Sequence, residues 1–107
     1  MAEVCCVVFV TVASREEGEK IADALVGERL AACCNLAPGL FSVYRWKGKI
    51  HREPEVLLIA KTRHELFEKL RERVIALHSY EVPEIVALPI VAGHEPYLDW
   101  IRRETAP

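Results

Sequence analysis

The chain has 107 residues, of which 51% are hydrophobic and 28% charged, with a formal net charge of −2. This composition is typical of a soluble globular protein, and we expect a single domain over residues 1–107. The near-neutral charge gives no electrostatic reason to expect nucleic acid or an anionic membrane as a partner. The apolar run at residues 4–13 is also too short to span a bilayer.

The four cysteines occur as two adjacent pairs, Cys5–Cys6 and Cys33–Cys34. Neighbouring side chains of a strand point to opposite faces, so neither pair can chelate one metal ion from a single face. The spacing matches no zinc or redox motif. Apolar neighbours indicate small buried hydrophobic side chains, and reduced thiols of this kind favour a cytoplasmic location.

The first third of the chain predicts a strand followed by a helix. Residues 3–12 are nearly all apolar and rich in valine, which is typical of a central strand covered on both faces. Ser14 and Glu17 have the spacing of a capping box, which predicts the start of a helix. Apolar residues then follow at helical spacing as far as Leu30.

The middle of the chain predicts a long hairpin. Residues 31–36 read as extended, and Pro38-Gly39 predicts a turn or kink after them. Residues 40–46 alternate between two faces, as in a strand. A turn at residues 47–49 is then followed by a third strand at residues 55–61.

The last part predicts a helix, a strand and a short terminal helix. Thr62 and Glu65 have the spacing of a second capping box. The core face of the helix after it would carry Leu66, Phe67, Leu70, Val74 and Leu77. Residues 84–91 predict a fourth strand, and Pro89, which has no N–H donor, places its end at an edge or bulge. Pro96 suits the first turn of a helix. That helix would carry Tyr97, Leu98 and Ile101 inward.

The element order is therefore β-α-β-β-α-β followed by a C-terminal helix. This order predicts an α+β fold of the ferredoxin-like, split β-α-β type, with the helices on one face of an antiparallel sheet. The strands have apolar residues in both phases, so the other face would be open and apolar. The long hairpin also exposes strand edges. Closed cyclic association covers both features, and we expect a homo-oligomer.

Candidate functional residues lie at two junctions between elements, residues 44–48 and 78–84. His78 has two interpretations: a metal ligand, or a cap at the C-terminal end of the second helix, where a cation meets the helix dipole favourably. Glu84 is either a ligand or proton acceptor, or a carboxylate at the start of a strand, paired with Lys61.

Tyr44 and Trp46 also have two interpretations. They could form a stacking platform, or they could pack into a neighbouring subunit, as aromatic side chains at interfaces often do. No nucleophile has a base at a recognisable spacing, no glycine-rich phosphate loop is present, and no full metal triad appears in the sequence. We therefore expect that the protein is not an enzyme.

Six motifs occur in order along the chain. They are Leu30-Ala-Ala-Cys-Cys-Asn35, Pro38-Gly39, Ser42-x-Tyr-x-Trp-x-Gly48, Lys61-Thr62, His78-x-Tyr-x-x-Pro-Glu84 and Tyr97-Leu-x-Trp100. Together they resemble the CutA divalent-cation tolerance proteins from the first strand to the last helix. The resemblance implies a ferredoxin-like subunit in a tight homotrimer, located in the cytoplasm and linked to tolerance of copper and other divalent cations.

The resemblance transfers a metal site only in part. Copper ligands proposed for the family include a cysteine at the end of the first strand and a histidine near the His-x-Tyr motif. The matching first-strand position here is Val10. His78 and Glu84 are therefore the predicted metal ligands, and they would bind Cu(II) or another divalent cation with modest affinity unless another subunit supplies further ligands.

The resemblance of such trimers to nitrogen-signalling PII proteins implies a second class of function. The chain would then be a regulatory trimer that binds a small ligand in clefts between subunits, without a dedicated metal site. The residues expected to line such a cleft, besides the two metal-ligand candidates, are Tyr44, Trp46, Lys61 and Tyr80. The expected partners are further copies of the chain and divalent metal ions.

Overall fold

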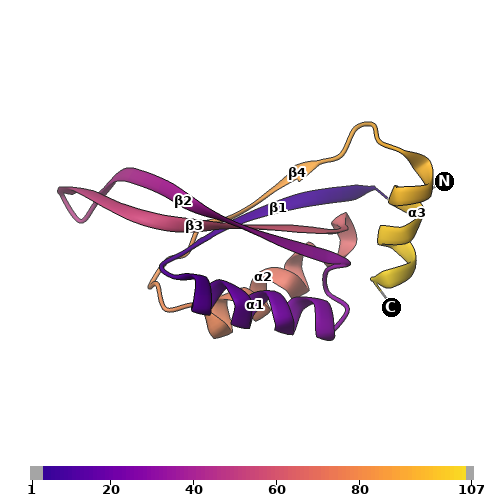
Figure 1. Cartoon of the computed structure of the whole chain (residues 1–107), viewed down its shortest axis with the longest axis horizontal. Coiled ribbons are helices and arrows are strands. Elements are labelled where there is room, and N and C mark those ends of the chain that lie inside the picture. Colours follow the sequence, from indigo (N-terminus) through magenta and orange to yellow (C-terminus); the bar gives the residue numbers. More distant parts are fainter. Residues whose placement is uncertain (1–3, 106–107) are drawn as a thin grey trace.

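A four-stranded antiparallel sheet forms one layer of the protein, and two helices cover one of its faces (Figure 1). The computed structural model describes residues 4–105. The strands are β1 (Cys5–Val12), β2 (Cys33–Trp46), β3 (Lys49–Arg63) and β4 (Ile85–Pro89), in the order β2-β3-β1-β4. This arrangement confirms the predicted split β-α-β fold. Glu3, which the predicted first strand included, lies outside the described residues, as do the ends of the expected domain.

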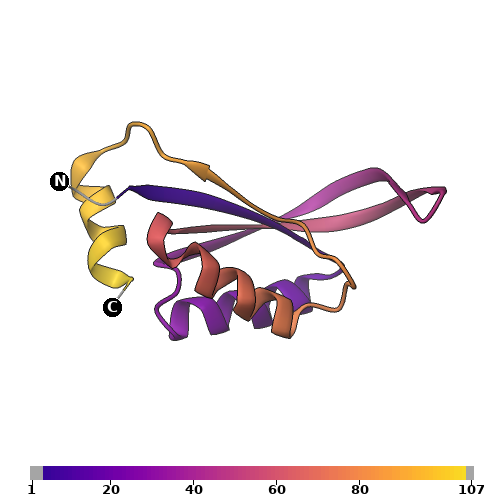
Figure 2. The same cartoon turned by 180° about the vertical axis from the view of Figure 1, so that it is seen from behind.

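The helices that cover the sheet are α1 (Arg15–Gly27) and α2 (Phe67–Leu77), and α3 (Glu95–Glu104) packs at the end of the sheet farthest from the hairpin (Figure 2). Side chains from alternate positions of β1 and β3 meet both covering helices, as strand geometry requires. The buried core contains Cys6, Val8, Val10, Val12, Ile21, Leu25, Leu58, Ala60, Leu70 and Val74. The predicted inward face of α2 is therefore confirmed. That of α1 is confirmed at Ile21 and Leu25, but Val26, which has the same helical spacing, is 42% exposed.

Both ends of α1 are closed by hydrogen bonds. At the start, the Ser14 hydroxyl accepts from the Glu17 N–H at 3.2 Å, which confirms the predicted cap. At the end, the Leu30 N–H donates to the Leu25 carbonyl at 2.8 Å, and Arg29 between them is left-handed, with φ of 62°. The Arg29 guanidinium in turn donates to the carbonyls of residues 103 and 104, so the end of α1 holds the end of α3.

The second predicted capping box is wrong. Thr62 is fully buried inside β3, and its hydroxyl donates to the Leu30 carbonyl at 2.7 Å. A buried hydroxyl needs a partner, and the nearest one is across the fold instead of along the next turn. Glu65 forms an ion pair with Arg63. A short 3-10 turn, His64–Leu66, leads into α2 without a side-chain cap.

The β2–β3 hairpin extends well beyond the body of the domain (Figure 1). Its two-residue turn consists of Lys47 and Gly48, with φ of 51° and 79°, as tight hairpin turns with matched twist require. The pairing register shifts between Ala37 and Leu40, at the predicted kink. β4 is an edge strand, as Pro89 predicts, but it spans Ile85–Pro89 and is shorter than the predicted strand over residues 84–91.

The sheet face opposite α1 and α2 is apolar, as the sequence predicts. Phe9 of β1 pairs with Ile59 of β3 and Val86 of β4 on this face. Val86 and Leu88 are each 46% exposed, and the hairpin exposes further apolar side chains. Those side chains are Phe41, Val43 and Ile50. An apolar surface of this extent marks an interaction site in a single chain.

The terminal helix α3 agrees with the prediction at two of three positions. Leu98 and Ile101 are buried and pack with Cys5 and Ala32. Tyr97, which was also predicted to point inward, is 40% exposed and stacks on the Trp100 ring. The reason is helical periodicity, because a helix of this length presents only one narrow face to the sheet.

Within residues 4–105, no helix is both long and apolar enough to cross a membrane.

Two glycines of α1 give a matched test of packing around the helix. A β-carbon at Gly27 would meet nothing within 4 Å, whereas at Gly18 it would lie 3.0 Å from Leu36 Cδ2. Gly27→Ala should raise the free energy of unfolding by about 0.5–1 kcal/mol, because alanine loses less backbone entropy in a helix. Gly18→Ala should gain less, because Leu36 must move. Urea denaturation at fixed protein concentration measures both, and an equal gain in the two variants would contradict the packing difference.

Candidate functional site

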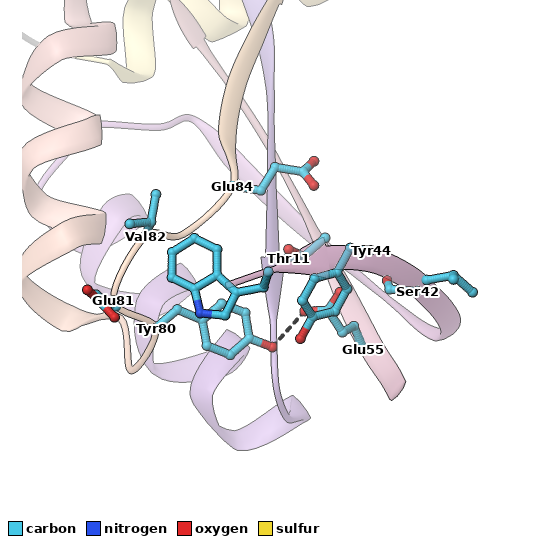
Figure 3. Close-up of a pocket in the computed structure, with 10 residues that line it drawn as sticks. Thr11, Ser42, Tyr44, Glu55, Tyr80, Glu81, Val82 and Glu84 are labelled. Atoms are coloured by element: carbon cyan, nitrogen blue, oxygen red, sulfur yellow. Dashed lines mark hydrogen bonds between the residues drawn. The ribbon is translucent and has the colours of Figure 1, made fainter. Parts of the chain in front are cut away.

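A cleft of about 430 Å³ lies between the outer part of the β2–β3 hairpin and the segment that joins α2 to β4. Figure 3 shows Tyr80 and Val82 of this segment on one side, with Ser42, Tyr44 and Glu55 of the hairpin on the other. The lining residues are Thr11, Ser42, Val43, Tyr44, Trp46, Glu55, Tyr80, Glu81, Val82 and Glu84. Three of them are carboxylates and none is Lys, Arg or His, so the lining is acidic.

Tyr80 and Glu55 form the floor of the cleft. The Tyr80 hydroxyl donates to Glu55 Oε2 at 2.6 Å, and Glu55 is almost completely buried (Figure 3). Burial of the phenol, followed by this hydrogen bond to a carboxylate, raises the pKa of Tyr80. The phenol therefore stays protonated at neutral pH and acts as the donor of the pair.

Tyr44, on the hairpin, likewise donates a hydrogen bond to a carboxylate. Its hydroxyl donates to the Glu53 carboxylate, and its ring stacks on His51, the residue opposite it in the strand pair, at a centroid distance of 5.2 Å. The hydrogen bond to Glu53 is the main cause that raises the pKa of Tyr44 to about 12. Both tyrosines thus give their only proton to a carboxylate, and their oxygens remain as acceptors.

An ammonium group of the chain lies at the rim of the cleft. Lys47 Nζ is 3.2 Å from Glu81 Oε1 and 5.6 Å from the centroid of the Trp46 ring. Both charged side chains are about two-thirds exposed, so the ion pair contributes at most about 1 kcal/mol. It nevertheless joins the tip of the hairpin to the segment that leads into β4.

The His78 ring is fully buried and fixes the backbone of that segment. Its Nε2 lies 2.7 Å from the Thr11 carbonyl, and its Nδ1 accepts from the Tyr80 N–H at 3.0 Å. A ring that donates through Nε2 and accepts through Nδ1 is neutral. His78 caps α2 with its backbone N–H, which donates to Val74, while its ring is directed to β1 and not to the helix dipole.

Glu17 holds the same segment from the start of α1. Its Oε2 accepts from the Ser79 N–H at 2.7 Å, and its Oε1 accepts from the Ala13 N–H at 3.3 Å. Burial alone raises the pKa of Glu17, but the hydrogen bonds from Ser79 and Ala13 outweigh it and lower the pKa. One carboxylate therefore joins α1, β1 and the α2–β4 segment.

Four of the six predicted site residues line the cleft, namely Tyr44, Trp46, Tyr80 and Glu84. His78 lies behind Tyr80, with the ring centroids 4.6 Å apart. Lys61 lies elsewhere, with its Nζ 3.1 Å from Asn35 Oδ1. The register explains this separation, because Lys61 pairs near the start of β1 and β4 begins opposite its end. The suggested pairing of Lys61 with Glu84 is therefore wrong.

The metal ligands predicted from the sequence do not form a complete site in one chain. Among residues 4–105, no three His, Cys, Asp or Glu side chains are placed to hold a metal ion. Both His78 ring nitrogens already hold backbone hydrogen bonds, whereas Glu84 is exposed. Burial raises the pKa of Cys6 to about 11 and of Cys34 to about 12, so both thiols keep their protons at neutral pH in the metal-free chain. Metal binding would need donors from a second copy.

The sequence analysis did not identify Glu53 and Glu55, the two carboxylates that accept hydrogen bonds from Tyr44 and Tyr80. Their signal was the strand alternation itself, because Glu53, Glu55 and His51 share one face of β3. Pairing that face with Tyr44 across the hairpin would have found the first contact. The role of Glu17 could not be found in this way, because it depends on how α1 packs against the α2–β4 segment.

Known proteins similar to the chain point to one family. A family model described as "CutA1 divalent ion tolerance protein" matches residues 6–104. The divalent-cation tolerance protein CutA of Thermus thermophilus is 58% identical over 99 residues, which cover 92% of this chain and 96% of that protein. Human Protein CutA is 46% identical over 97 residues, covering 91% of this chain but 54% of the human protein.

Solved structures agree with the sequence matches. The structure named as the periplasmic divalent cation tolerance protein CutA from Archaeoglobus fulgidus superposes with a TM-score of 0.92 at 41% identity. It covers 95% of this chain and 99% of that one. The chain thus spans nearly the whole of the microbial relatives, and about half the length of the human and plant ones it matches.

Glu17→Gln tests the carboxylate that joins α1 to the cleft segment. Loss of its charge-assisted hydrogen bonds should lower the free energy of unfolding by about 1–2 kcal/mol at neutral pH. Because the folded-state pKa is lowered, this stabilisation is complete above the unfolded-state value of about 4.3 and is lost as the pH falls through the folded-state value. The two proteins should therefore converge in acid.

Glu19→Gln is the matched control for this experiment. Glu19 forms an exposed ion pair with Arg15 on the same helix at 2.6 Å, and its removal should cost less than about 0.5 kcal/mol. Urea denaturation at several pH values and one protein concentration makes the comparison. Equal losses for Glu17→Gln and Glu19→Gln would contradict the role given to Glu17.

Proposed function

The chain belongs to the CutA1 divalent ion tolerance family, and we propose that it acts as a homotrimer that binds divalent cations with modest affinity at the acidic cleft. The observation that carries this proposal is the exposed carboxylate of Glu84, which has no hydrogen-bond or ion-pair partner among residues 4–105 and lies in a lining without basic residues. A carboxylate left unpaired in an acidic cleft attracts cations.

The predicted ligands of the metal remain Glu84 and His78. Glu84 is available as it stands, whereas His78 would have to give up the hydrogen bond from Tyr80 or the one to Thr11 before a ring nitrogen could bind copper. One carboxylate and one imidazole are a weak donor set for a borderline metal. Modest affinity, completed by a donor from a neighbouring copy, follows from this set.

The apolar surfaces that a single chain leaves exposed support the homotrimer. The open face of the sheet is apolar along β1, β3 and β4, and the projecting hairpin adds Phe41 and Ile50, which are 58% and 62% exposed. Burial of such side chains contributes about 1.5–3 kcal/mol each. Closed cyclic assembly covers the face and the hairpin together without leaving an open end.

We further propose that the protein is not an enzyme and is located in the cytoplasm. The family is named for divalent-cation tolerance and not for a reaction. All four cysteines are free, which suits a reducing compartment. A PII-like role with an anionic small ligand gains no support, because such a ligand would be repelled by the three carboxylates of the cleft.

The assembly proposal predicts a species of three chains in native mass measurement. Trp46→Asp should weaken that assembly, because it places a charge on the hairpin that would pack against a neighbour. Val26→Asp is the control, since Val26 is also exposed but lies on α1, away from the hairpin. A stable monomer for the unmodified chain at micromolar concentration would refute the trimer.

The metal proposal predicts that Cu(II) affinity falls in both Glu84→Gln and His78→Ala, by about tenfold or more for each lost ligand. Imidazole binds metal only in its neutral form, so affinity should also weaken as the solution is made acidic. Calorimetry at two pH values measures these changes, with Glu72→Gln on the exposed side of α2 as control. Unchanged affinity in both site variants would remove the metal from these residues.

A further inference from the structure

We propose that α3 is a lid that opens as a unit while the rest of the domain stays folded. Only two of its ten residues, Leu98 and Ile101, are buried, and they pack with Cys5 and Ala32. This cluster is separate from the main core, which the other two helices cover. Segments with few buried apolar contacts open at a lower free energy than the core does.

Two adjacent cysteines of β1 show that the sheet separates the two clusters. Cys5 belongs to the cluster under α3, whereas Cys6 belongs to the main core, because successive side chains of a strand point to opposite faces. Both are almost completely buried in the closed structure. α3 can therefore leave its face of the sheet without opening the core that buries Cys6.

The segment before α3 provides the hinge. Residues 91–94 belong to no helix or strand, and all four are exposed, with Val91 at 93%. His94, the residue before the helix, forms no side-chain cap. An exposed segment with few contacts can change its backbone angles at little cost. The start of α3 is thus held less firmly than its end.

The end of α3 is held by two arginines, Arg29 and Arg63, which form the latch of the lid. Arg29 donates to the carbonyls of residues 103 and 104, at 2.6 and 3.2 Å. Arg63 donates to the Thr105 hydroxyl at 3.0 Å and to the Thr105 carbonyl at 2.7 Å. The last carbonyls of a helix have no partners within it, and charged donors bind them more strongly than neutral ones.

The backbone at Arg29 is strained, and the latch offsets that strain. Its φ of 62° is left-handed, a conformation that glycine adopts readily and that other residues adopt at a cost. Glycine at this position would relieve the strain but could not reach α3. The arginine therefore exchanges local backbone strain for two hydrogen bonds to the end of the lid.

Thiol labelling of the whole assembled protein tests the lid, with Cys5 as reporter and Cys6 as internal control. In native buffer, iodoacetamide should modify Cys5 about tenfold faster than Cys6 or more, since only opening of the main core exposes Cys6. Fragmentation in mass spectrometry distinguishes the two neighbouring positions. Hydrogen exchange should agree, with the hydrogen-bonded amides of α3 exchanging together and before those of α1.

Two variants loosen the latch by different routes. Arg29→Gly removes one arm and suits the left-handed backbone, so the end of α1 stays folded. Thr105→Val removes the hydroxyl that accepts from Arg63 and keeps the shape of the side chain. Each should raise the labelling rate of Cys5 about tenfold, the effect of one charge-assisted hydrogen bond, and leave that of Cys6 nearly unchanged.

Arg73→Gln is the matched control for the loss of an arginine. Arg73 pairs with Glu28 at 2.9 Å, and this ion pair links α2 to the end of α1 instead of to the lid. The variant should leave the ratio of Cys5 to Cys6 labelling as it is in the unmodified protein.

Three outcomes would overturn the inference. A single labelling rate for Cys5 and Cys6 in the unmodified protein would mean that α3 opens only together with the core. Equal acceleration of both thiols in the latch variants would mean that the two arginines stabilise the whole domain and not the lid. No acceleration of Cys5 in either variant would mean that these hydrogen bonds do not hold α3 closed.

Discussion

The cleft depends on one buried imidazole. His78 ends α2, yet its ring bonds to the last part of β1 and to the backbone two residues further along its own chain. Because it is neutral and has no access to water, each nitrogen requires a partner, and these two partners allow only one path for the segment. Tyr80 is thereby directed to Glu55, and Glu81 to the hairpin. The acidic wall is a result of this path.

The hairpin supplies the other wall, and its geometry is largely local. Strand alternation places Tyr44, His51 and Glu53 on one face, and the short turn at Lys47 and Gly48 sets which residues face one another. These features could be predicted from sequence. The order of elements, the kink at Pro38 and the edge position of β4 were predicted in this way. Local chemistry determines them, so local patterns reveal them.

The contacts made by Thr62, Lys61 and His78 could not be predicted, because they depend on packing between segments that are distant in the sequence. Thr62 has the spacing of a cap, but its burial in β3 redirected the hydroxyl to Leu30. Lys61 and Glu84 both lie at strand ends, yet the register of β1 with its two neighbours places those ends far apart. His78 was predicted to be a metal ligand or a cap that meets the helix dipole, and the bonds of its ring to the backbone of Thr11 and Tyr80 were not foreseen.

The irregularity at Pro38 and Gly39 also limits how copies of the protein can associate wrongly. β2 is an edge strand of 14 residues, and an uninterrupted edge of that length offers a template for open-ended pairing with other chains. Proline has no N–H to donate, and the shift in register between Ala37 and Leu40 bends the strand at the same point. The edge is divided into two shorter runs. The protein can therefore expose a long hairpin with apolar side chains while its interrupted edge disfavours open-ended strand pairing between copies.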